Sequence, residues 1–327
     1  MDTISVIIVN WNGKKWLQKC LSSLSSQTYK KLEIIVVDNN SSDHSIDFVK
    51  RNFPHVKIIK CKQNFGFATA NSIGIKSSKG KYIILINNDT WIERDFVEQL
   101  SSFYLSHNYD IVAPVEHTYD KKKRIDLVST IDFTGSAAYY FPKNIHTKLF
   151  YLSGVCLFFL KTFYKETLGL DNNFFMYFED VDWFWRLTLL GKKFARADNI
   201  SLYHNGVGST GAGIKYNMFL WRNQNILQML IKNYSAFSLI FILPLYFIQN
   251  VFEMVFFLII GKPKISYTYL LGWTFNIKHM KIILRERKWI QRNRRVSDIE
   301  IIKKMYHSAG KLQSLVIYLK TKYAKSV

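Results

Sequence analysis

Several carboxylates and one histidine stand where they could act on a charged ligand. Asp38 ends an apolar run at residues 32–37, and Asp89 follows a second run at residues 82–86. A carboxylate at the end of a strand can bind a nucleobase or ribose, or hold a divalent cation on a diphosphate. Each position also has a structural interpretation, because Asp38 can cap the next helix and Asn-Asn-Asp is common in turns.

A second acidic group lies among aromatic residues. Glu179, Asp180 and Asp182 stand between Phe-Phe-Met-Tyr-Phe and Trp-Phe-Trp. Such surroundings can raise the pKa of a carboxyl group, which suits a general base. The same residues suit the first turn of a helix, where acidic side chains interact favourably with the dipole, and both interpretations can hold. Further along, His204 precedes a glycine-rich stretch at residues 206–211. A lone histidine is usually a structural residue, and the glycine-rich stretch adds weak support for contact with a ligand or phosphate.

Apolar runs alternate with helix-like stretches through the first hundred residues. Strands that alternate with helices predict a largely parallel sheet with both faces covered. Such sheets bind ligands at the carboxyl ends of their strands, where this chain has its polar clusters. Strands are predicted at residues 6–9, 32–37, 56–59 and 82–86, and helices at 16–24, 44–51 and 67–77. A further apolar segment is expected at 155–160, and a helix that carries Glu179 follows it.

Composition excludes several classes of protein. The chain has 327 residues, of which 48% are hydrophobic and 21% charged, as in a globular protein rather than a disordered one. Its three cysteines, Cys20, Cys61 and Cys156, show no CxxC spacing, which argues against a zinc site and fits a reducing compartment. The apolar run at residues 4–9 is too short for a signal peptide. No GxGxxG follows the first strand, which argues against a dinucleotide-dependent enzyme.

The net charge of +21 favours anionic partners. Residues 278–327 hold fourteen Lys and Arg against three Asp and Glu. No nucleic-acid-binding motif is present, and the basic residues follow an apolar segment at 236–260, so we expect a membrane surface and no nucleic acid. That segment is long enough to span a bilayer. However, Tyr246, Gln249, Asn250 and Glu253 fall on one helical stripe, which favours a helix that lies in the interface or packs this stripe against the catalytic domain.

The basic tail is expected to bind acidic lipid. The residues concerned are Arg285, Arg287, Lys288, Arg292, Arg294 and Arg295. The alternative is a buried core helix followed by a solvated tail.

Six segments, taken in order, resemble family 2 glycosyltransferases, especially the bacterial rhamnosyltransferase-like branch. The resemblance covers about residues 3–215, and its strength lies in the order and spacing of the motifs. The segments are SVIIVNWN at 5–12, IVVDNNSSD at 35–43, NFGFATAN at 64–71, LINNDT at 85–90, the block from Gly169 to Asp182 that contains the Glu-Asp pair, and His204. One departure is that Asn87 occupies the first acidic position of the family's DxD motif.

The resemblance implies a GT-A fold, which is a Rossmann-like, mixed and mostly parallel α/β sheet flanked by helices. A catalytic domain would cover residues 1–215, with a nucleotide-sugar half at about 1–115 and an acceptor half at about 116–215. Residues 216–327 would form a helical, basic, membrane-associating region. Asp180 would be the catalytic base, and Asp89 and His204 would hold Mg²⁺ or Mn²⁺.

Further site residues follow from the same resemblance. The nucleotide-sugar-binding residues would be Asn10, Asp38, Asn64, Gly66, Asn71 and Asn88. The acceptor side would be formed by Gly154, Glu179, Asp182 and Trp183.

The implied function is an inverting, metal-assisted transfer of a sugar, with rhamnose the leading candidate, from a nucleoside-diphosphate donor. The acceptor would be a hydroxyl of a glycan or lipid-linked glycan in surface polysaccharide synthesis. The protein would work at the cytoplasmic face of the cell membrane, as a peripheral or monotopic protein. The alternatives are a galactofuranosyl or hexosyl transferase of the same fold, or a non-catalytic nucleotide- or glycan-binding protein.

Overall fold

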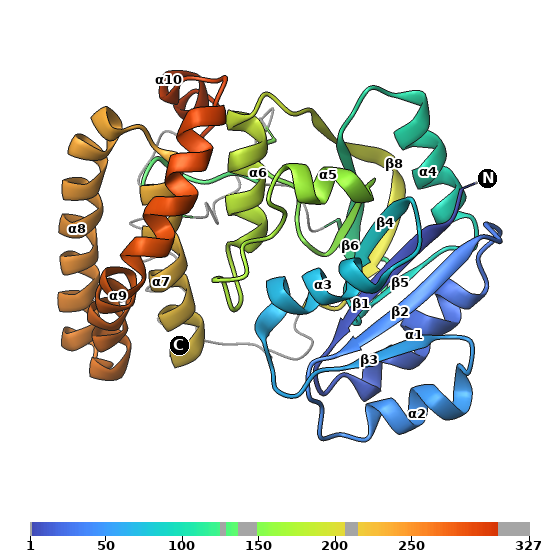
Figure 1. Ribbon diagram of the computed structural model, residues 1–327. Coiled ribbons are helices and arrows are strands. Elements are labelled where there is room, and N and C mark those ends of the chain that lie inside the picture. Colours follow the sequence, from blue (N-terminus) through green and yellow to red (C-terminus); the bar gives the residue numbers. More distant parts are fainter. Residues whose placement is uncertain (1, 125–128, 137–148, 207–214, 307–327) are drawn as a thin grey trace. The chain divides into compact units, whose positions relative to one another are not determined.

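The structure is a computed structural model that describes residues 2–124, 129–136, 149–206 and 215–306. It divides into two compact units (Figure 1). Unit 1 comprises Met1–Asp126, Leu152–Trp183 and Lys192–Gly213, and unit 2 comprises Leu127–Tyr151, Phe184–Gly191 and Ile214–Val327. Most of the glycine-rich stretch after His204 and the last part of the basic tail lie outside the described residues. The functional division at about residue 215 stays a prediction.

Unit 1 contains a mixed sheet. Its described residues form an 8-stranded sheet in the order β3-β2-β1-β4-β7-β6-β8-β5. The first four strands in this order pair in parallel, as do β6 and β8, whereas β7 and β5 run antiparallel to their neighbours. The strands are β1 (Ile4–Asn10), β2 (Leu32–Asp38), β3 (Lys57–Lys60), β4 (Tyr82–Ile86), β5 (Thr90–Ile92), β6 (Ile111–Thr118), β7 (Cys156–Leu160) and β8 (Phe194–His204).

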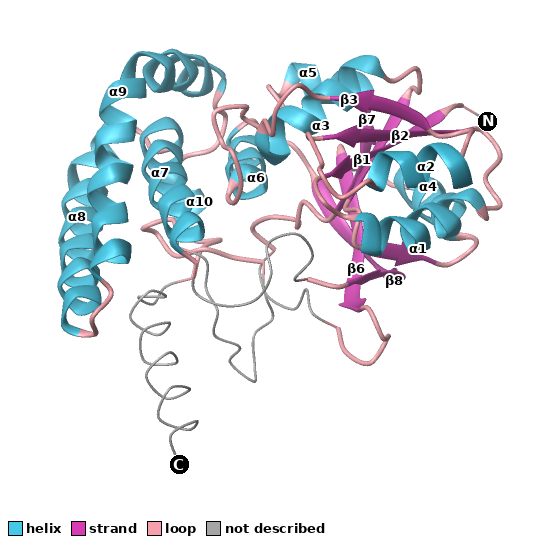
Figure 2. Ribbon diagram, turned by 90° about the horizontal axis from the view of Figure 1, so that it is seen from below, coloured by secondary structure: helices cyan, strands magenta, loops and turns pink. Residues whose placement is uncertain are grey.

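Helices cover both faces of this sheet (Figure 2). They are α1 (Lys14–Ser25), α2 (Ser45–Asn52), α3 (Gly66–Ser77), α4 (Phe96–Ser106) and α5 (Lys161–Glu166). Leu17, Leu21 and Leu24 of α1 join a core cluster with alternate residues of β1, β2 and β4. On the opposite face α3 packs closely, because a Cβ on Gly74 would lie 2.4 Å from Cγ2 of Ile7. The predicted α/β sheet with flanking helices is confirmed.

Strand register brings the polar strand ends together. Asn10 at the end of β1 pairs with Asp38 at the end of β2. Thr90 of β5 pairs with His204 of β8, and the Asn205 N–H donates to the carbonyl of Asp89 at 3.1 Å. Residues distant in sequence therefore meet at one edge of the sheet, where a ligand can contact several strands at once.

Unit 2 is helical. It contains α7 (Tyr216–Asn233), α8 (Ala236–Ile259), α9 (Pro263–Asn293), α10 (Asp298–Ile302) and the second half of α6 (Glu179–Leu189), a helix that begins in unit 1. The apolar segment predicted at 236–260 is the helix α8. It is long and apolar enough to cross a membrane by length and composition.

The basic tail requires a correction. The first part of the basic segment belongs to the 31-residue helix α9, which ends at Asn293. Two of the arginines expected to bind lipid are engaged within unit 2. Arg294 pairs with Asp298, with 2.6 Å between Nη2 and Oδ1, and the guanidinium of Arg287 donates to backbone carbonyls of α7 and its C-cap. These two side chains are held by the protein because each donates hydrogen bonds to partly buried acceptors.

Candidate active site

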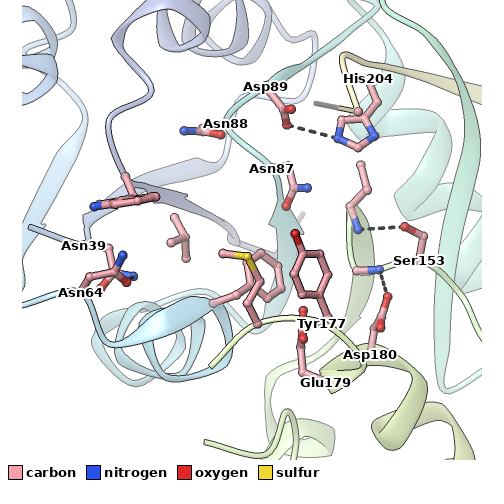
Figure 3. Close-up of a pocket in the computed structure, with 17 residues that line it drawn as sticks. Asn39, Asn64, Asn87, Asn88, Asp89, Ser153, Tyr177, Glu179, Asp180 and His204 are labelled. Atoms are coloured by element: carbon pink, nitrogen blue, oxygen red, sulfur yellow. Dashed lines mark hydrogen bonds and ion pairs between the residues drawn. The ribbon is translucent and has the colours of Figure 1, made fainter. Parts of the chain in front are cut away.

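Unit 1 contains a pocket of about 300 Å³ at the carboxyl ends of β1, β2 and β4 (Figure 3). Seven of the thirteen predicted site residues line it, namely Asn64, Asn88, Asp89, Gly154, Glu179, Asp180 and His204. Other residues of its lining are Val9, Trp11, Asn39, Phe67, Asn87, Ser153, Val155, Met176, Tyr177 and Gly206. The strand ends, the loop before α3 and the start of α6 thus share one cavity.

An acid–histidine–acid chain occupies one side of the pocket. Nε2 of His204 lies 3.2 Å from Oδ1 of Asp89, and Nδ1 lies 3.4 Å from Oε2 of Glu116 on β6. Burial lowers the pKa of His204, but the hydrogen bonds and charges of Asp89 and Glu116 outweigh it and raise the pKa to about 9. Sequence reasoning missed Glu116. Its only local signal is a carboxylate directly after the apolar residues of β6.

This arrangement fits a divalent cation on a diphosphate. A metal-binding histidine usually gives its other ring nitrogen to a carboxylate, which is the place of Glu116 beside His204. Asp89 adds hard oxygen ligands from the turn between β4 and β5. Among the residues that the structure describes, no group of three His, Cys, Asp or Glu side chains forms a complete metal site. The remaining ligands would come from the diphosphate and water, as is common for Mg²⁺.

The opposite side of the pocket carries Glu179 and Asp180 in the first turn of α6. Oδ2 of Asp180 accepts from the Gly154 N–H at 2.9 Å, and Oδ1 accepts from the Val181 N–H at 2.7 Å. Burial raises the pKa of Asp180, and these backbone hydrogen bonds partly oppose that rise. Burial and the nearby charge of Asp180 raise the pKa of Glu179 to about 8. The pair therefore combines one held carboxylate with a second group that keeps its proton at neutral pH.

The segment before this pair has an uncommon backbone. Tyr177 and Phe178 both have positive φ, at 71° and 68°. This conformation costs on the order of 1 kcal/mol or more for each residue other than glycine. It presents the Tyr177 ring to the pocket, where its hydroxyl points toward Asn87 (Figure 3). No local pattern in the sequence indicated Tyr177, because the backbone conformation depends on the packing around it.

The loop before α3 forms a hydrogen-bonded wall. Nδ2 of Asn39 donates to Oδ1 of Asn64 at 2.7 Å, and the same oxygen accepts from the Gly66 N–H at 2.9 Å. Gly66 has φ of 81°, and a Cβ there would lie 2.2 Å from the carbonyl oxygen of Phe175. Glycine is therefore required both by the backbone angle and by the close approach of the segment that carries Tyr177.

Six predicted site residues do not line the pocket. Asn10 is buried, donates to Ser45 and accepts from Nδ2 of Asn88 at 2.9 Å, so it orients a lining residue. Asp38 is buried and accepts from the Ser41 N–H at 3.2 Å. Gly66 contributes through its backbone. Their roles as ligand contacts stay predictions.

The other three residues, Asn71, Trp183 and Asp182, are also buried inside the protein. Asn71 donates to the carbonyl of Phe67 at 3.0 Å inside α3. The indole of Trp183 is buried, donates to Oγ1 of Thr167 at 3.0 Å and packs against Phe159. Asp182 is fully buried one residue before it. These contacts stabilise the walls of the site. The roles of the three residues in ligand binding stay predictions.

Comparison with known proteins identifies the family. Residues 5–168, about half of the chain, match the sequence model of glycosyl transferase family 2. The chain belongs to this family. Its similarity to one relative extends further: the UDP-Glc:alpha-D-GlcNAc-diphosphoundecaprenol beta-1,3-glucosyltransferase WfaP of Escherichia coli is 27% identical over 241 residues, which is 70% of this chain and 86% of WfaP.

Other relatives match over shorter parts. Glycosyltransferases GlyA and GlyG of Streptococcus pneumoniae are 32% and 29% identical over 37% of this chain. The match spans only 18% of GlyA and 41% of GlyG. Neither comparison distinguishes the rhamnosyltransferase-like branch, which stays a prediction.

Solved structures share the fold. Staphylococcus aureus TarS 1–349 in complex with UDP-GlcNAc superimposes with a TM-score of 0.51 at 18% identity, over 71% of this chain and 67% of TarS. GalNAc-T7 with UDP, GalNAc and Mn²⁺ gives a TM-score of 0.57 at 16% identity, over 73% of this chain and 49% of that one. These neighbours confirm the predicted GT-A architecture.

Proposed function

We propose that this family 2 member transfers a sugar from a nucleoside-diphosphate donor to a hydroxyl group of a lipid-linked glycan, with inversion at the anomeric carbon. The observation that carries the proposal is that the Asp89–His204 pair and the Asp180 carboxylate line one pocket. One side can hold a diphosphate and the other can accept a proton, which are the two requirements of a single displacement.

Asp180 is proposed as the general base. Its two hydrogen bonds from backbone N–H groups fix the carboxylate at the start of α6. Each carboxylate oxygen keeps a further lone pair that can bind the hydroxyl group of the sugar acceptor. It takes the hydroxyl proton while the acceptor oxygen attacks the anomeric carbon and the bond to the diphosphate breaks. Glu179, which holds its own proton at neutral pH, avoids placing a second buried negative charge beside the base.

Asp89 and His204 are proposed to hold the leaving group. A Mg²⁺ or Mn²⁺ ion bound there would neutralise the charge that develops on the diphosphate. Glu116 keeps the imidazole oriented with Nε2 toward Asp89. Asn39, Asn64 and Asn88 offer amide groups that can bind the nucleotide, and Asp38, Gly66, Asn71 and Asn10 are proposed to complete that half of the site.

The donor sugar and acceptor are open to direct test. Rhamnose remains a candidate from the sequence, and the name of WfaP adds glucose from UDP-Glc and a diphosphoundecaprenol-linked acceptor. Galactofuranose is the third candidate. A lipid-linked acceptor places the reaction at a membrane, and the cytoplasmic face is proposed because the free cysteines fit a reducing compartment.

The test is release of nucleoside diphosphate from a panel of UDP- and dTDP-sugars, with Mg²⁺ or Mn²⁺ and a lipid extract that contains diphosphate-linked glycans. Asp180→Asn is the diagnostic variant, and Asp47→Asn, an exposed carboxylate on α2, is the matched control. We expect release with one donor, a loss of 10²-fold or more in Asp180→Asn, and no change in the control. Undiminished release in Asp180→Asn would remove it from the mechanism. Binding of UDP without turnover of any donor would favour a non-catalytic binding protein.

A further inference from the structure

Helix α8 of unit 2 presents an apolar face along its entire length. Large apolar side chains on this face recur three or four residues apart and remain exposed. Among them are Phe237, Ile240, Phe241, Ile248, Phe252 and Ile259, with exposed fractions from 54% to 79%. Only 22% of the most apolar window of the helix is buried. An apolar surface of this extent on a soluble chain is uncommon and marks a site of interaction.

The opposite face of α8 is covered by α9. Tyr246, Asn250 and Glu253 are buried, and Oε2 of Glu253 accepts from the hydroxyl of Tyr269 at 2.6 Å. The rings of Phe247 and Trp273 also meet, with 5.2 Å between centroids. The polar stripe that argued against a membrane span thus has its partner within unit 2. Within the described part of the chain, a stripe of apolar side chains parallel to the helix axis stays uncovered.

Helix α9, which packs on α8, carries a row of positive charge on its exposed side. Lys278, Lys281, Arg285, Lys288 and Arg292 are exposed, and their spacing of three and four residues places them on one helical face. The one acidic residue in α9 is Glu286, which pairs with the buried Lys232 of α7 at 3.4 Å. An apolar face next to a basic stripe complements the headgroups and acyl chains of an anionic bilayer.

We propose that the free face of α8, flanked by the basic stripe of α9, docks into one leaflet of an anionic bilayer with the α8 axis in the membrane plane. The inference deepens the membrane part of the proposed function. It attributes membrane binding to a defined surface of α8 and α9, which would bring the protein to the membrane that holds a lipid-linked acceptor.

The packing of α9 on α8 favours an α8 that lies in the plane of the membrane over one that crosses it. At 24 residues α8 is about 36 Å long, enough to cross a hydrocarbon core of about 30 Å. However, α9 runs back along α8, as the contacts of Glu253 with Tyr269 and of Phe247 with Trp273 show. A crossing α8 would carry the neighbouring part of α9, with Lys278 and Lys281, into hydrocarbon, where such charges are costly.

A second copy of the chain is a poorer occupant of this surface. Each copy has a net charge of +21, and its basic stripe lies beside the apolar face. Two such surfaces repel each other at moderate salt, whereas an anionic membrane attracts both. A bilayer therefore satisfies the apolar and the charged parts of the surface together.

The first experiment measures flotation of the full chain with vesicles of phosphatidylcholine alone or mixed with phosphatidylglycerol. The variant Ile240→Ser/Phe252→Ser removes two apolar side chains that are 66% and 69% exposed, so its folding in water should not suffer. Leu105→Ser on α4 of unit 1, 64% exposed, is the matched control. We expect a loss of vesicle affinity of roughly tenfold or more in the double variant and none in the control.

The charged stripe has its own test. Lys281→Gln/Lys288→Gln should lower affinity for the phosphatidylglycerol vesicles by about fivefold per charge and leave the phosphatidylcholine vesicles unaffected. High salt should produce the same selective loss.

The second experiment tests the orientation of α8. Single cysteines replace Ala236 and Lys264, one near each end of α8, in a Cys61→Ser background, since Cys20 and Cys156 are buried. Protein bound to preformed vesicles is treated with a membrane-impermeant maleimide. We expect both positions to react as fast as in lipid-free protein. Protection of either end until detergent is added would show a crossing helix and overturn the in-plane geometry.

Two further outcomes would contradict the proposal that the free face of α8 binds the membrane. One is unchanged flotation of Ile240→Ser/Phe252→Ser. The other is a lipid-free dimer, measured by light scattering, that the same variant dissociates, because the face would then belong to a second copy. Donor turnover in detergent is measured in parallel with Asp180→Asn. Loss of turnover with intact flotation affects only the proposed function, and the reverse result affects only the docking surface.

Discussion

Replacing Glu179 by Gln should stabilise the protein at neutral pH. Glu179 is 7% exposed, and its Oε2 has no hydrogen-bond partner among the described residues. In the unfolded chain its pKa is near 4.5, and in the folded protein burial and Asp180 raise it to about 8. Between these values the unfolded state releases a proton that the folded state keeps. Glu179 therefore contributes stability that is fully present below pH 4.5 and is lost as the pH rises through 8.

The size of the effect follows from this window. A difference of one bound proton between the folded and unfolded states changes the free energy of unfolding by a little over 1 kcal/mol per pH unit. The wild type therefore loses about 3 kcal/mol of stability between pH 4.5 and pH 7. Glutamine keeps the shape of the protonated acid and cannot ionise. The free energies of unfolding of wild type and Glu179→Gln should be similar at pH 5 and should diverge toward pH 8, with the variant more stable.

The assay is urea unfolding of both proteins at several pH values, with Glu166→Gln, an exposed carboxyl at the end of α5, as the control. Comparing variants at each pH cancels the contributions of titrating groups that do not interact with Glu179, whereas the contribution of the neighbouring Asp180 is part of the measured difference. A difference that does not grow between pH 5 and pH 8 would refute the assignment of a neutral, buried Glu179. We expect turnover to fall in Glu179→Gln, because stability gained at a site carboxylate commonly costs activity.

Two further predictions concern the supports of the site. Glu116→Gln removes the charge that orients His204 and should weaken Mn²⁺ affinity, measured by titration in the presence of UDP, by about 10- to 100-fold; unchanged affinity would mean that the Glu116 contact does not serve metal binding. Gly66→Ala should lower the free energy of unfolding by about 1–3 kcal/mol more than Gly206→Ala. Both glycines have positive φ, but only the first has a backbone oxygen, that of Phe175, in the way. Equal losses in urea unfolding would show that this contact relaxes without strain.

Several features could be predicted because their signals are local. Buried strands in an α/β sheet are continuous apolar runs, so β1, β2 and β4 could be placed within a few residues. The stripe of Tyr246, Asn250 and Glu253 indicated that one side of α8 is polar, because helical periodicity is a property of the segment itself. The order of the motifs from residue 5 onward indicated the family that the comparisons confirm.

Other features depend on which segments meet in space. Glu116 reaches His204 only because β6 pairs with β8, and no spacing along the chain indicates that pairing. Asn10 and Asp38 sit at strand ends as predicted, yet register and packing turn Asn10 toward Ser45 and Asn88 and leave both residues off the pocket lining. The region of α9 was expected to be helical, but the sequence did not indicate which of its basic side chains are held internally, because the contacts of Arg287 and Arg294 depend on α7 and α10.

The amino-acid sequence by itself therefore determined the fold class, the family and the segments that carry the site. These follow from periodicity and motif order, which act over a few residues at a time. Tertiary structure alone decided which side chains face the pocket, that Gly66 must accommodate Phe175, and that α8 keeps an uncovered apolar face. Each of these depends on contacts between residues far apart in the chain, and the free energy of such contacts exists only once the segments are packed together.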